Sequence, residues 1–131
     1  MSHATLAVVQ QFYDMLDRGD VPTILDALDP GVHWQAPESM PWGGTFHGHA
    51  GFQEFLGKLL DQPVEWGREV QEILDTGSDK VVARLTFTGR PRNGQPEFGV
   101  PEVHVWTVRD GKVSGLDAYF DTAIVLRERE Q

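Results

Sequence analysis

The sequence predicts an α+β fold in which about three helices pack on the concave face of a curved antiparallel sheet. Apolar residues recur at helical spacing in the first half of the chain and at every second position in the second half. Hairpin turns separate the alternating segments, and no strand–helix–strand rhythm, repeat or linker occurs. Residues 1–131 are therefore expected to form a single domain. Helices against a strongly curved sheet make a cone with an open mouth, which suits a small-molecule pocket.

The helices are expected in the first half of the chain. Over residues 5–18 the apolar side chains recur every three to four positions, which is the period of one helix face. Gly19 ends this helix, and Asp20 is suited to cap a second helix that runs through Leu28. A further helix is expected over residues 49–61, beyond a structured loop rich in proline, glycine and aromatic residues.

Strands are expected where β-branched and aromatic residues alternate with polar ones, over residues 31–36, 64–74, 81–87 and both arms of a hairpin at 97–121. Asp110-Gly111 at the centre of this hairpin is a strong signal for a tight turn. Because side chains alternate across each arm, the hairpin has one apolar face and one polar and aromatic face. After the hairpin, residues 123–127 suit a short closing helix with Asp121 as its cap.

The composition argues against several classes of function. The chain has no cysteine, which excludes a disulfide framework and a thiol nucleophile and is typical of a reducing compartment. No secretion signal or long apolar run occurs, so a soluble, cytoplasmic protein is expected. A net charge of −9 repels phosphate backbones and anionic lipids, so neither nucleic acid nor a membrane is an expected partner. No nucleotide-binding motif or zinc-ligand spacing is present, and no cofactor or metal is expected.

Three motifs and the order of elements resemble the SnoaL-like branch of the nuclear transport factor 2-like superfamily, which includes the ketosteroid isomerases. The motifs are VVQQFYDMLDRGD near the start, PWGGTFHGHAGFQEFL in the middle, and VHVWTVRDGKV with AYFD near the end. The resemblance covers nearly the whole chain. It implies a cone-shaped fold that holds a small, largely apolar molecule. It leaves the activity open, because the superfamily also includes cyclases, epoxide hydrolases, dehydratases and non-catalytic binding modules.

The positions that carry isomerase chemistry in this family are apolar here. Aligned through VVQQFYDML, the family's tyrosine falls on Phe12, its aspartate base on Ala36 and its second oxyanion acid on Val103. The acid that epoxide hydrolases of this fold place on the last strand falls on Ala118. A ketosteroid isomerase of the usual kind is therefore not expected. The cyclases, which place an acid and a histidine on the last strands, are closer in kind.

His104 and Asp117 are the candidate catalytic residues. His104 shares a strand face with Glu102 and Trp106, and hairpin pairing can bring Asp117 or Tyr119 near its ring. An imidazole oriented by a carboxylate transfers protons near neutral pH. This arrangement favours a cofactor-free acid/base enzyme of the isomerase, cyclase or hydrolase type.

In the alternative interpretation, which we favour, this polar and aromatic face is the outer face of the sheet. Tryptophan and tyrosine suit interfaces, so the face would pack against a second subunit in a homodimer. The hairpin residues that face the cavity would then be Val103, Val105, Leu116, Ala118 and Phe120. These side chains can shape a pocket but cannot move a proton, which leaves a non-catalytic ligand-binding or dimerisation module as the alternative function.

The other expected ligand-binding residues are aromatic. They are Phe12, Tyr13, Trp34, Trp42, Phe55 and Phe87. Trp42 precedes two glycines and is placed to cover the mouth of the cone as a lid. On the strand at 31–36, His33 and Gln35 alternate with Trp34 and Ala36, and either pair can face the cone.

Overall fold

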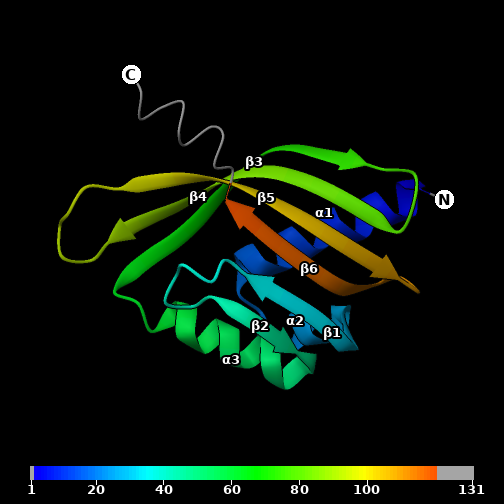
Figure 1. Cartoon of the computed structure of the whole chain (residues 1–131), viewed down its shortest axis with the longest axis horizontal. Coiled ribbons are helices and arrows are strands. Elements are labelled where there is room, and N and C mark those ends of the chain that lie inside the picture. Colours follow the sequence, from blue (N-terminus) through cyan, green and yellow to red (C-terminus); the bar gives the residue numbers. More distant parts are fainter. Residues whose placement is uncertain (1, 121–131) are drawn as a thin grey trace.

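In a computed structural model, which describes residues 2–120, helices pack against one face of a curved six-stranded sheet (Figure 1). The predicted α+β class is confirmed. The elements in chain order are α1 (Ser2–Arg18), α2 (Val21–Ala27), β1 (Leu28–Ala36), β2 (Gly44–His47), α3 (Gly48–Leu60), β3 (Val64–Asp75), β4 (Lys80–Pro91), β5 (Phe98–Arg109) and β6 (Lys112–Phe120). No helix in this part of the chain is long and apolar enough to cross a membrane.

The strands follow the order β2-β1-β6-β5-β4-β3. After α3 the chain crosses to the far edge of the sheet and returns through hairpins, so that β6 arrives beside β1 (Figure 1). Hairpins make antiparallel pairs, whereas β1 and β6 run parallel. The sheet is therefore mixed, which the sequence did not predict, because the parallel pair joins two strands that are distant in the chain.

Local signals explain most element boundaries. Gly19 ends α1 with a positive φ of 70°, and the carboxylate of Asp20 accepts a hydrogen bond from the Thr23 amide at the start of α2. Both residues of the Asp110-Gly111 turn have positive φ, at 52° and 75°, as a tight hairpin turn requires. The short strand β2 lies inside the predicted loop and was missed. The predicted closing helix lies outside the described residues.

The inner face of β5 is the opposite of the predicted one. Glu102, His104 and Trp106 point toward the helices and are buried, whereas Val103 and Val105 lie on the outer face. A side-chain period of two means that any error of one residue inverts every position of a strand. The alternating valines looked like a core stripe, but the chain buries the polar and aromatic stripe instead.

The strand β6 has the predicted orientation. Leu116 and Ala118 are buried, and they pair across the sheet with Trp106 and His104. The apolar face of β6 and the polar face of β5 therefore share the inner side of the sheet. The prediction placed Glu102, His104 and Trp106 on the outer face together with Asp117. It is wrong for these three residues of β5 and correct for Asp117 on β6.

Aromatic rings form the centre of the core. Trp106 is fully buried, and its ring meets Phe12, Tyr13 and Trp34 at centroid distances of 5.4, 5.3 and 5.8 Å. These contacts are steeply angled, as aromatic pairs prefer. They join α1, β1 and β5 at one point, so the helical layer and the sheet are held together by one cluster of rings.

We expect Phe12→Ala to lower the free energy of unfolding by about 3–5 kcal/mol, because it leaves a void beneath Trp34 and Trp106. Urea denaturation measures this change. The control is Leu60→Ala on α3, where 61% of the residue is exposed and the loss should be about 0.5 kcal/mol or less. Equal losses in the two variants would contradict the proposed core.

Candidate active site in the cone

A cavity of about 300 Å³ lies between the helices and the inner face of the sheet. Its walls are mainly apolar, and its aromatic lining consists of Trp34, Trp42, Phe52, Phe55, Trp66, Phe87 and Trp106. Four ionisable side chains also line it: Asp17, Arg68, Glu102 and His104. A largely apolar pocket with a few polar groups is the kind of place where small-molecule sites are found.

A chain of hydrogen bonds runs from the core to the cavity. The indole Nε1–H of Trp106 donates to the Tyr13 hydroxyl at 2.9 Å. The same hydroxyl lies 2.7 Å from His104 Nδ1, and His104 Nε2 lies 2.7 Å from Glu102 Oε1. The helix α1 thus supplies the tyrosine, and alternate positions of β5 supply the other three residues.

The donors in this chain follow from chemistry. An indole nitrogen only donates, so the Tyr13 oxygen accepts from Trp106. Burial raises the pKa of Tyr13 well above its ordinary value, so the hydroxyl keeps its proton. This O–H donates a hydrogen bond to His104 Nδ1. A neutral imidazole carries its single proton on the other nitrogen, and Nε2–H then donates to Glu102. Every donor has an acceptor in this assignment.

Glu102 lines the cavity, and only one of its carboxylate oxygens has a hydrogen-bond partner within residues 2–120. Its Oε1 is held by His104, while Oε2 has no hydrogen-bond partner within residues 2–120. The side chain is buried and lines the cavity. A carboxylate with one oxygen fixed and the other directed at a ligand is oriented to accept a proton.

Arg68 on β3 brings a positive charge to the same cavity. Its guanidinium bonds the carboxylate of Asp17 on α1 and lies 5.9 Å from the centre of the Tyr13 ring. An aromatic face attracts a cation, so Tyr13 contributes to holding Arg68 in position. Tyr13 therefore contacts an ionisable side chain on each side, Arg68 through its ring and His104 through its hydroxyl.

Trp34 carries a buried donor with no acceptor. Its Nε1 has no hydrogen-bond partner in the described part of the chain, although the residue lines the cavity. The ring lies among Phe52 and Phe55, at centroid distances of 4.8 and 5.5 Å. Buried unpaired donors are rare in folded proteins. A ligand oxygen that reached this nitrogen would gain a hydrogen bond.

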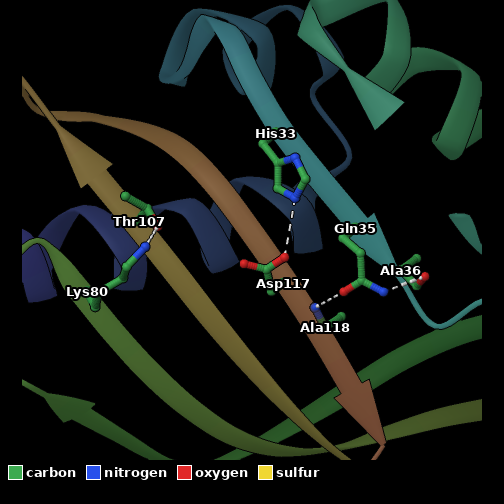
Figure 2. A network of polar contacts seen from close by, with 7 residues as sticks. All are labelled: His33, Gln35, Ala36, Lys80, Thr107, Asp117 and Ala118. Atoms are coloured by element: carbon green, nitrogen blue, oxygen red, sulfur yellow. Dashed lines mark hydrogen bonds and ion pairs between the residues drawn. The ribbon is translucent and has the colours of Figure 1, made fainter. Parts of the chain in front are cut away.

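The predicted pairing of His104 with Asp117 is wrong. His104 pairs with Ala118 on the inner side, and Asp117 lies on the outer side, 3.3 Å from His33 Nε2 (Figure 2). The partners of His104 are Tyr13 and Glu102 instead. The histidine was recognised from the sequence, but its partners lie on α1 and on its own strand.

The first strand resolves the alternative that the sequence left open. Trp34 and Ala36 face the cavity. Gln35 accepts a hydrogen bond from the Ala118 amide at 3.2 Å and lies on the same side of the sheet as His33 (Figure 2). The family position of the aspartate base is therefore an apolar part of the cavity wall.

The remaining predicted ligand-binding residues fall into groups. Those that line the cavity are Trp34, Trp42, Phe55, Phe87, Leu116 and Ala118. Phe12 and Tyr13 lie in the buried core behind the wall, and Val103 and Val105 lie on the outer face. Phe120, at the end of β6, does not line this cavity.

Sequence reasoning gave Glu102 no role in the cavity and missed Arg68 altogether. A signal for Glu102 existed, because Glu102, His104 and Trp106 share one strand face and a tryptophan is more often buried than exposed. Arg68 gave no comparable signal. It faces inward because β3 pairs with β4 in the register that places Arg68 opposite Phe87.

Residues 9–116 match the sequence profile of the SnoaL-like domain. The chain belongs to the SnoaL-like domain family. The predicted resemblance to the SnoaL-like branch and the nuclear transport factor 2-like fold are confirmed. No protein of curated function matches this SnoaL-like chain.

Solved structures similar to this SnoaL-like protein cover almost its whole length. TerC, crystallised with polyporic acid, is 30% identical, with a TM-score of 0.80 over 98% of this chain and 99% of TerC. A protein of unknown function from Burkholderia pseudomallei is 30% identical, with a TM-score of 0.80 over 97% of each chain. An epoxide hydrolase of M. tuberculosis is 17% identical, with a TM-score of 0.72 over 96% of this chain and 89% of its own, and shares the fold.

The pH dependence of stability tests the burial of Tyr13. Its pKa is raised in the folded SnoaL-like protein from the ordinary value of 10.0, so the unfolded chain loses this proton first as the pH rises. The free energy of unfolding should therefore fall above about pH 10, and Tyr13→Phe should remove part of this fall.

Urea denaturation between pH 7 and about 11 measures both curves. The two curves should run parallel below the ordinary tyrosine pKa, which serves as the internal control. Tyr13→Phe should lie lower there, because Trp106 and His104 lose a hydrogen-bond partner. Two stability curves that also stay parallel above the ordinary tyrosine pKa would show that Tyr13 is not buried as described.

Proposed function

We propose that this protein is a cofactor-free acid/base enzyme that acts on a small, largely apolar molecule in the cone. Glu102 is the proton acceptor and His104 is the adjoining catalytic residue that fixes its carboxylate. The observation that carries the proposal is the free Oε2 of Glu102 beside an apolar cavity, with Oε1 bonded to His104. The hydrogen bond from His104 fixes the orientation of the carboxylate, so that its second oxygen can accept a proton from a bound molecule.

The proposed reaction begins with a carbon acid. Glu102 Oε2 takes a proton from a carbon next to a carbonyl group, and the electron pair of that C–H bond moves into an enolate. Protonated Glu102 then returns the proton to another carbon or to oxygen, so the enzyme ends unchanged. Such a step serves an isomerisation or a ring closure. Throughout it, His104 Nε2–H holds Oε1, and Tyr13 holds His104.

Likeness to TerC supports a ligand in the cone. TerC is 30% identical over nearly the full length of both chains, and it was crystallised with polyporic acid. Polyporic acid is therefore a reasonable binding probe for this protein. The aromatic lining of the cavity also suits a ligand with aromatic rings.

Deuterium exchange of 2-tetralone tests the proposed base. This ketone has acidic protons next to its carbonyl group, and nuclear magnetic resonance follows their loss in heavy water. We expect Glu102→Gln to slow the protein-dependent exchange about 100-fold or more, because the amide cannot accept the proton. Polyporic acid should still bind.

The matched control is Glu54→Gln, which removes a carboxylate from the surface of α3 and should leave exchange unchanged. Wild-type exchange by the Glu102→Gln variant would refute the proposed base. Tight binding of polyporic acid without any exchange above buffer would favour the alternative, a non-catalytic ligand-binding module.

The outer face of the sheet supports a second proposal, a homodimer. Leu74 and Tyr119 are 50% and 52% exposed there. Leu74 on β3 pairs with Val82 on β4, which pairs in turn with Val105 on β5, and both valines are partly buried. Exposed apolar groups in one row mark an association surface, and a symmetric pair of such faces would cover them.

We expect the wild type to sediment at twice the 14.7 kDa mass of one chain and Leu74→Asp to sediment as a monomer. The substitution places a charge in the apolar row, which an interface would have to desolvate. Leu60→Asp, on α3, is the matched control and should remain dimeric. A monomeric wild type, or dissociation of both variants, would contradict this interface.

A further inference from the structure

We infer that the cone binds its ligand as an organic anion, in which a carboxylate or ionised enol oxygen pairs with Arg68. This inference rests on the proposed function and narrows the class of ligand. The ligand is a largely apolar, ring-containing molecule with one acidic oxygen group.

Arg68 is the only lysine or arginine that lines the cavity within residues 2–120. Its position on β3, opposite Phe87 on β4, turns the side chain toward the helices. Only 19% of the side chain is exposed, although arginine usually lies in water. A partly buried guanidinium presents several N–H donors to whatever enters the cavity.

The present partner of Arg68 is easily exchanged. Asp17 lies at the end of α1 with 61% of its side chain exposed, and ion pairs with so exposed a carboxylate contribute little to stability. The Tyr13 ring beneath Arg68 holds the guanidinium from another side. A ligand carboxylate can therefore replace Asp17 while Arg68 keeps its position, and a planar guanidinium binds a carboxylate through two hydrogen bonds.

The same ligand can reach the proposed base. Tyr13 lies under Arg68 with its ring and bonds His104 with its hydroxyl, so Arg68 and the Glu102–His104 pair lie near opposite parts of one side chain. The guanidinium of Arg68 presents several N–H donors to this cavity. These donors recognise oxygen acceptors, whereas the remaining walls recognise rings.

The negative net charge of the protein opposes the binding of an anion, so a preference for an anionic ligand is a clear test of the role of Arg68. A net charge of −9 and the carboxylate of Glu102 both disfavour an anion in the cone. Without a specific cation, a neutral ligand should bind better than its anionic counterpart. A preference for the anion therefore has to come from Arg68.

The experiment compares 2-naphthoate with 2-naphthamide by isothermal titration calorimetry. The two probes have the same rings, and only the first is an anion. We expect the wild type to bind 2-naphthoate at least about tenfold more tightly, as a charge-assisted pair of hydrogen bonds allows. Arg68→Met should abolish this preference, and Arg68→Lys should retain part of it. Asp17→Asn should tighten 2-naphthoate binding and leave 2-naphthamide unchanged, because it removes the competing carboxylate.

Arg84→Met is the matched control, since Arg84 pairs with Glu72 on the outer face and should not affect either probe. Equal affinity of the wild type for both probes, absence of 2-naphthoate binding, or an unchanged preference in Arg68→Met would each overturn the inference. If Arg68→Met fails to fold, the Asp17→Asn comparison decides. The 2-tetralone exchange uses a neutral ketone and tests Glu102, so failure of the base and failure of the anion site give different results.

Discussion

The hydrogen bond between the Trp106 indole and the Tyr13 hydroxyl is the interaction on which the site depends. The buried indole N–H of Trp106 has an acceptor because Tyr13 supplies its hydroxyl oxygen from α1. The hydroxyl of Tyr13 in turn donates a hydrogen bond to His104 Nδ1, and this bond fixes the imidazole tautomer. Satisfying the buried Trp106 N–H therefore also packs α1 against β5 and orients the Glu102 carboxylate.

The sequence predicted α1, α2, α3, most strands and the tight turn of the hairpin between β5 and β6, because each depends on neighbours in the chain. The face of β5 could not be predicted in the same way. Val103 and Val105 have the stronger apolar signal, yet the core takes Trp106 with the polar residues that satisfy it. The inward position of Arg68 depends on the register of β3 against β4, which no local pattern encodes.

The ionisable groups of the cavity lie at other positions than the acids expected from the family resemblance. The family positions of the acids at Ala36 and Ala118 are cavity wall, and Phe12 is core. The acid lies on β5 at Glu102, beside Val103 in sequence but on the opposite side of the sheet. One curved sheet with alternating side chains offers several places for a carboxylate, so the fold alone does not fix the chemistry.

The parallel contact between β1 and β6 also has a consequence for synthesis of the chain. Gln35 on β1 bonds the amide of a residue 83 positions later, so one wall of the cavity joins β1 to β6. A growing chain lacks that wall until β6 has left the ribosome. Until then β1 has an unpaired edge, and the apolar lining of the cone faces water. The exposed edge and lining favour aggregation of the growing chain during this interval, which ends when β6 is added.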